Sequence, residues 1–151
     1  MPLSFKKDSI QNQLDLNFSL KSEIILENCN FLLKNCENIT VPCVFQVWEK
    51  TIIPRERKIS KTTTLYFNFT TPDNADIRIQ RVGGNAGKAS LDLNRAVSSN
   101  YFIKNNTSLT NEEFVNFVNN LTFPTIAYTV GPKSLSKGEL IEVFENEFKK
   151  S

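Results

Sequence analysis

The chain has 151 residues, of which 40% are hydrophobic and twelve are Phe, and its formal net charge is +2. Its length suits one globular domain and is short for two, and its apolar content favours a packed core over a disordered chain. A net charge this small excludes a chain that works only as a basic nucleic-acid-binding arm.

Cysteine content and hydropathy exclude further classes. The chain has three Cys and no His. The odd cysteine count argues against a closed disulfide framework, and we expect no metal site. No segment approaches the roughly 20 apolar residues of a membrane span, and the first residues lack the apolar core of a signal peptide. We therefore expect no membrane partner and a reducing, cytoplasmic location.

The N-terminal segment predicts a short helix followed by a short strand. Asp8 or Ser9 is suited to cap a helix that runs to Leu16. The apolar residues of Glu23–Leu26 predict a strand of four residues.

A second strand is predicted after two turns. Residues 28–33 are expected to turn the chain, and the polar cluster 35–38 is typical of a turn. The apolar run Val41–Trp48 has the length and the side chains of a strand buried on both faces. Residues 51–63 are polar and basic and contain a Pro, which predicts a loop that leaves the sheet.

The middle of the chain alternates apolar and polar side chains, which is typical of half-buried strands. Thr64–Thr70 is one such strand, with Leu65 among its inward residues, and Ile77–Val82 is another. Gly83–Gly87 must form a loop between this strand and the weak helix or irregular segment 89–96.

The last third of the chain predicts a strand and two helices. Asn100–Ile103 is expected to be a strand. Thr110 with Glu113, and Ser136 with Glu139, have the spacing of a capping box, and apolar residues follow each pair at helical spacing. These two closing helices are the best-defined elements in the sequence.

The glycine loop is the main candidate for binding. Its spacing differs from that of a phosphate-binding loop, because only three residues separate Gly83 from Gly87 and Ala89 follows Lys88. Glycines nevertheless permit a close backbone approach to phosphate, and nearby cations neutralise a nucleic-acid backbone. The alternative is a tight turn with solvated charges. The residues expected to bind nucleic acid are Arg78, Arg81, Gly83, Gly84, Asn85, Gly87, Lys88, Arg95 and Tyr101.

Three segments resemble parts of adenine-N6 DNA methyltransferases of phages and giant viruses. Met1–Phe5 is similar to a strand end in that family, Val41–Trp48 to a late antiparallel strand, and 78–88 to a loop of the target-recognition portion. The resemblance implies the second half of such an enzyme. The Asn-Pro-Pro-aromatic motif and the glycine-rich loop for S-adenosylmethionine are not in this sequence, so we expect no catalysis and no cofactor in this chain alone.

The resemblance and the predicted elements imply an α/β or α+β fold. Residues 1–50 would be a methyltransferase-like remnant of a mixed β-sheet. Residues 51–151 would be a target-recognition-like α+β module of strands and two C-terminal helices, with a soft boundary that permits a single domain. An incomplete sheet leaves an unpaired edge, which favours a homo-oligomer or a complex.

Three functions follow from this fold. We expect a non-catalytic module of viral origin that binds DNA or a protein partner in the host cytoplasm or a virus factory. One alternative is a split or truncated adenine-N6 methyltransferase that needs an upstream part. Another is a viral structural or assembly protein.

Overall fold

The computed structural model describes residues 1–32, 34–35, 37–127 and 131–150. The chain divides into two compact units, the first formed by Met1–Ile59 and the second by Ser60–Ala127 together with the chain from Gly131 onward. The division lies inside the segment 51–63 that was expected to be a loop. Helices and antiparallel sheets occur in separate stretches of the chain, so the α+β class is confirmed.

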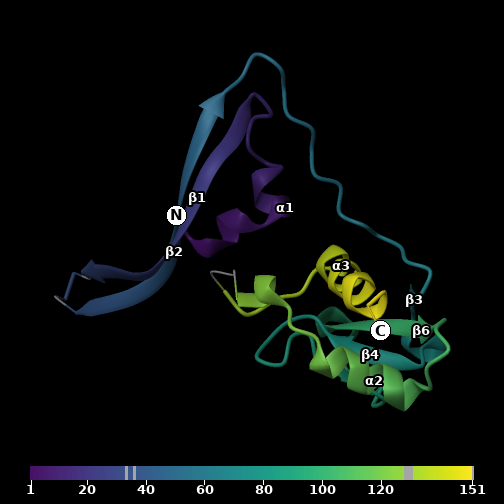
Figure 1. Ribbon diagram of the computed structural model, residues 1–151. Helices are drawn as coiled ribbons and strands as arrows, with labels where there is room; N and C mark the ends of the chain where they lie inside the picture. The colour runs from purple at the N-terminus through teal and green to yellow at the C-terminus, as the bar shows by residue number, and fades with distance from the viewer. Residues whose placement is uncertain (33, 36, 128–130, 151) are drawn as a thin grey trace. The chain divides into compact units, whose positions relative to one another are not determined.

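The first unit is dominated by a long β-hairpin of strands β1 (Phe18–Leu32) and β2 (Asn38–Lys50), which pair antiparallel (Figure 1). Strand β1 is much longer than predicted, and the turn expected at 28–33 is wrong. The register shifts between Leu26 and Cys29, so the intervening polar residues form a bulge without ending the strand. The hairpin bends in this region (Figure 1).

Two short helical turns precede the hairpin: η1 (Leu3–Lys6) and α1 (Asp8–Gln11). The helix predicted to reach Leu16 ends early, and its N-cap is Lys7, which makes no side-chain cap. The guanidinium of Arg55 donates to the carbonyl oxygens of Gln11 and Leu14. These are acceptors that a continuing helix would use, so a contact with a distant residue replaces the helical hydrogen bonds.

Strand β2 is not buried on both faces as predicted. Val44 is buried and Gln46 nearly so, whereas Phe45 and Val47 between and after them are exposed. The Nε2 of Gln46 donates to the oxygen of Phe5 at 3.3 Å, so η1 lies over this face of β2. Among the described residues of the first unit, no helix covers the other face.

The second unit contains a four-stranded antiparallel sheet. Its strands are β3 (Phe67–Thr70), β6 (Asn100–Asn105), β4 (Ile77–Gln80) and β5 (Ala89–Ser90), in that order across the sheet. The mixed sheet that we expected is therefore replaced by two antiparallel sheets. The 3₁₀ turns η2 (Pro72–Asn74) and η3 (Val97–Ser99) connect the strands.

The alternation of apolar residues predicted these strands with two errors. Ile77 and Ile79 are buried as expected. Leu65, expected to point inward, lies before β3 and is 90% exposed. The two residues of β5 were missed, because Ala89 pairs with Ile79 through a contact that no local pattern marks.

Two helices pack on the sheet (Figure 1): α2 (Asn111–Asn120) and α3 (Lys137–Phe148), with the 3₁₀ turn η4 (Pro124–Ala127) between them. Both predicted capping boxes are present. The ring of Phe144 stacks on that of Phe114 at 5.0 Å and meets Phe67 edge-on at 5.2 Å. This aromatic cluster joins both helices to one face of the sheet.

Candidate nucleic-acid interface

The nine residues expected to bind nucleic acid separate into three groups: Arg78 with Arg95, Arg81 with Tyr101, and the residues of the glycine loop with Lys88. Arg78 lies in β4 with its partners on the polar side of the sheet, opposite the buried Ile77 and Ile79. Arg81 follows the strand and points to the other side. Because side chains alternate along a strand, two arginines three positions apart face in opposite directions. The two arginines were predicted to bind together, and the structure separates them.

Arg78 belongs to a structural network. Its Nε donates to the carbonyl oxygen of Asp92 at 2.8 Å, and its Nη1 donates to Oδ1 of Asn100 at 2.9 Å. Arg95 pairs with Asp92 at 3.0 Å. The backbone N–H of Asn94 and the guanidinium of Arg95 lower the pKa of the Asp92 carboxyl. Both arginines thus order the irregular segment 91–99, and a nucleic acid would compete with these contacts.

Tyr101 is a core residue and not a platform for a base. Its side chain is only 8% exposed, and its hydroxyl donates to the carbonyl oxygen of Leu135 at 3.0 Å. Burial raises the pKa of this hydroxyl. Stacking on a base requires an open ring face, so this candidate is corrected.

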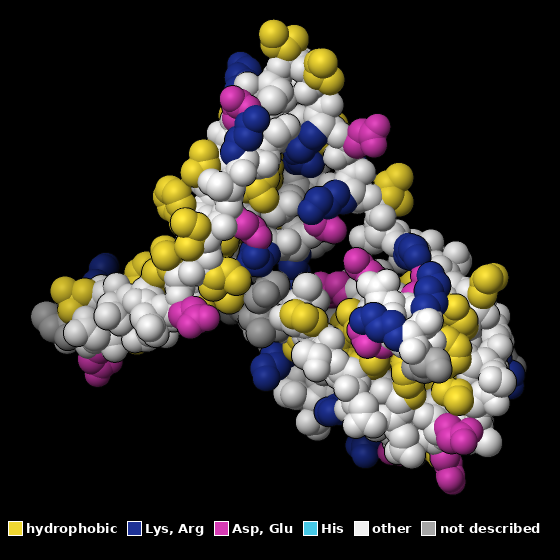
Figure 2. Space-filling model, in the orientation of Figure 1, with side chains coloured by type: hydrophobic (Ala, Val, Ile, Leu, Met, Phe, Trp, Pro, Cys, Tyr) yellow, Lys and Arg dark blue, Asp and Glu magenta, His cyan; other side chains and the backbone are white. Residues whose placement is uncertain are grey.

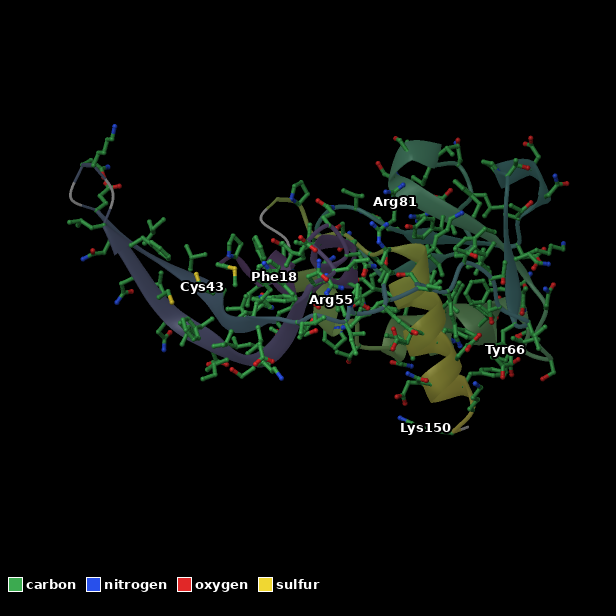
Figure 3. All side chains as sticks on the ribbon, turned by 90° about the horizontal axis from the view of Figure 1, so that it is seen from above. Phe18, Cys43, Arg55, Tyr66, Arg81 and Lys150 are labelled. Atoms are coloured by element: carbon green, nitrogen blue, oxygen red, sulfur yellow. The ribbon has the colours of Figure 1, made fainter. Side chains whose placement is uncertain are left out.

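Cations gather at the rim of Tyr101. The guanidinium carbon of Arg81 lies 5.3 Å from the centre of the ring, and Nζ of Lys137 lies 5.9 Å from it. Lys137 also lies 4.4 Å from the ring of Phe69. These cation–π contacts hold two positive charges near one another on the second unit. Figure 3 labels Arg81 at this end of the unit, well apart from Tyr66.

Structural reasons account for two of the three glycines in the loop. Gly83 has φ +101° and Gly87 has φ +90°, which L side chains rarely adopt. A Cβ on Gly87 would also lie 2.8 Å from the ring of Phe123. At Gly84 a Cβ would meet nothing within 4 Å, so neither reason applies there.

The tip of the loop is open. Gly84 and Asn85 are exposed. No hydrogen bond within the described parts of the chain engages their backbone N–H groups, whereas those of Gly83 and Ala86 donate inside the fold. Exposed consecutive amides can receive an anion.

A pocket of about 290 Å³ opens beside this loop. Lys88 and Lys133 both line it, together with the apolar residues Phe123 and Ile126. Nζ of Lys88 donates to the carbonyl oxygen of Asn119 at 3.1 Å, which fixes this lysine over the end of α2. The loop, the residues after α2 and residue 133 together make the site.

Lys133 was missed by the sequence analysis. The backbone N–H of Gly83 donates to the carbonyl oxygen of Lys133 at 2.9 Å, and the backbone N–H of Leu135 donates to the carbonyl oxygen of Arg81 at 2.8 Å. This short antiparallel pairing brings together residues about fifty positions apart in the sequence, and no local motif marks it. Hereafter Arg81, Gly84, Asn85, Lys88, Lys133 and Lys137 are called the basic loop surface.

The structure gives little sign of other chemistry. Among the described residues, no three metal-ligating side chains come together, and no helix has the length and hydropathy to cross a bilayer. Two of the three segments that resemble methyltransferases, Met1–Phe5 and Val41–Trp48, lie side by side in the first unit, where Val44 N–H donates to the oxygen of Met1 at 2.8 Å, and the third, 78–88, lies in the second unit.

No protein-family model, curated protein or solved structure matches the chain. The resemblance to methyltransferases and the location in the cytoplasm therefore stay predictions.

Proposed function

We propose that the second unit is a non-catalytic module that binds the phosphate backbone of a nucleic acid through the basic loop surface. The observation that carries the proposal is that Lys88 and Lys133 line one pocket, close in the fold to the open amides of Gly84 and Asn85. Cations and backbone N–H groups are the two kinds of donor that bind phosphate without reading sequence.

The neighbouring charges support this assignment. Arg81 and Lys137 are held on the ring of Tyr101, and the segment 133–135 pairs with the backbone of 81–83. Like charges held close together by the fold repel one another, and a bound polyanion relieves that repulsion. The same charges give no reason to prefer one base sequence over another.

The test is fluorescence anisotropy of labelled duplex and single-stranded DNA with the whole protein, over a series of salt concentrations. Each lysine that neutralises a phosphate contributes about 0.9 to the slope of log affinity against log salt on duplex DNA. Lys88→Ala with Lys133→Ala is therefore expected to weaken binding and to lower the slope by roughly two.

The matched control removes the same charge elsewhere. Lys21→Ala with Lys104→Ala deletes two lysines that are paired with Glu49 and Asp76, and it is expected to leave the slope unchanged. Equal losses in the two double variants would mean that net charge alone drives binding. Absence of binding to either form of DNA at low salt would remove the proposal.

Arg78→Ala is a poor test of binding. The side chain holds Asp92 and Asn100, so its loss disturbs the fold of the segment 91–99 as well as the charge.

A further inference from the structure

The hairpin of the first unit carries a continuous apolar face. Successive side chains of β2 alternate between two faces, and both extra residues of the bulges lie in β1. The odd-numbered residues of β2 therefore share one face along the strand. They are Ile39, Val41, Cys43, Phe45 and Val47.

Their partners in β1 extend this face. Ile24 pairs with Phe45, Leu26 with Cys43, and Phe31 with Ile39. The remaining pairs place Cys29 and Ser22 there. No charged residue occupies any of these five cross-strand pairs, and Ser22 is the one hydroxyl. The face ends at Glu49, which pairs with Lys21.

Most of this face is open. Its seven large apolar side chains other than cysteine are between 39% and 61% exposed. Figure 2 shows hydrophobic side chains following the hairpin in this view. With about 200 Å² for a fully exposed large apolar residue, these fractions correspond to roughly 650 Å². A patch of this size on one sheet face is more than the largest apolar patch of most monomers.

We propose that this face is the interface of a homodimer, in which the hairpins of two copies pack face to face. Two copies would bury roughly 1,300 Å² in total, which is within the range of stable interfaces of about 1,200–2,000 Å². An apolar surface without charge is complementary to itself, as a two-fold interface requires. The inference goes beyond the proposed nucleic-acid binding, because it concerns the other unit.

The pair Ile24 and Phe45 lies next to the central pair of the face, Leu26 and Cys43, of which Cys43 is buried. Ile24 and Phe45 are the most exposed side chains of the face, at 61% and 56%, and they stand opposite each other in the register. Large side chains near the centre of an interface carry most of its binding energy. From the sequence we expect association through an unpaired strand edge. Here Met1 and Pro2 pair with β2 along its outer edge, and the open feature is the face.

The test is analytical ultracentrifugation of the full chain over a series of concentrations. We expect a dimer that dissociates on dilution, and Phe45→Asp is expected to weaken association at least a hundredfold, since it places a charge in the most exposed apolar pair of the face. Ile52→Asp is the matched control, because Ile52 is fully exposed and lies outside the hairpin. It should remain as dimeric as the parent protein.

A second measurement does not depend on a variant. In a mixture of isotope-labelled and unlabelled copies, we expect isotope-filtered contacts between methyl groups of Val47 or Ile39 and the other copy. A protein that stays monomeric at every concentration would overturn the proposal. This holds both if another part of the same chain covers the face and if the monomer binds lipid vesicles. A ladder of larger species or equal effects of the two Asp variants would also overturn it.

Discussion

In the second unit Phe67, Phe114 and Phe144 are at most 1% exposed, whereas in the hairpin of the first unit Ile24 and Phe45 are more than half exposed. The first set is covered by two helices that close over a sheet. The second belongs to a two-stranded ribbon with one covered face. Apolar side chains on a sheet therefore form a buried core only where the same unit also supplies a second layer, here two helices, that covers them.

The polar contacts of the first unit reinforce this difference. Its covered face is held by a network in which Trp48 donates to Gln46, and Gln46 donates to Glu23 and Phe5. The guanidinium carbon of Arg55 lies 5.7 Å from the centre of the Trp48 ring. A two-stranded hairpin is marginally stable by itself, so the first unit relies on these contacts and on whatever covers its apolar face.

The largest expected effect comes from removing a ring in each unit. Phe144→Ala should cost about 3–5 kcal/mol of unfolding free energy in the second unit, because it leaves a cavity among five other rings. Phe45→Ala in dilute protein should cost less than about 1 kcal/mol, since more than half of that side chain is already in water. Hydrogen–deuterium exchange resolved by peptide separates α3 from β2. Equal losses of protection in both would contradict the comparison.

A smaller effect is expected within the glycine loop. Gly87→Ala should destabilise the second unit by about 1–3 kcal/mol, because φ is +90° and the new Cβ would meet Phe123 at 2.8 Å. Gly84→Ala is the matched control and should be near neutral, since open space surrounds it. Thermal unfolding followed by circular dichroism measures both variants. A destabilised Gly84→Ala would mean that the tip of the loop is packed.

The smallest effect concerns pH. The hydrogen bond from Lys61 lowers the pKa of Glu145 in the second unit, and the hydrogen bond from Lys6 lowers the pKa of Glu23 in the first. A depressed carboxyl pKa stabilises the fold above the unfolded pKa, and that stability is lost as pH falls through the folded pKa. Each pair should contribute less than about 1 kcal/mol, because one partner of each pair, Lys61 at 57% and Glu23 at 29% exposed, keeps contact with solvent.

The two carboxyls can be tested separately. Glu145→Gln should flatten the acid dependence of protection in α3 alone, and Glu23→Gln should do so in β1 and β2 alone. Hydrogen exchange at several acidic pH values, corrected for the intrinsic rate, measures this. If either variant changed the acid dependence of both units equally, the carboxyl would not act within its own unit.

Local signals predicted the second unit well. The capping boxes at Thr110 and Ser136 gave both helices, and the alternation around Ile77 and Ile79 gave β4. The first unit was predicted poorly, because its structure depends on distant contacts. Arg55 takes the carbonyl oxygens that would have continued α1, and pairing with β2 carries β1 through a polar bulge.

The candidate site shows the same division. The position of the glycine loop and the exposure of Lys88 could be predicted from neighbouring residues. The burial of Tyr101 and the place of Lys133 could not, because both depend on the pairing of 133–135 with 81–83. Arg78 and Arg81 were grouped by proximity in sequence, although strand geometry sends them to opposite sides.

The edge-on packing of Phe144 against Phe67 has a consequence for biosynthesis. The ribosome adds Phe144 almost eighty residues after Phe67, which takes roughly 4–15 s at about 5–20 residues per second. During that interval the nascent sheet has no C-terminal helix to shield its rings. We therefore expect chaperones that bind exposed aromatic segments to bind the nascent second unit during this interval. The hairpin is synthesised earlier, and both of its strands are then already present.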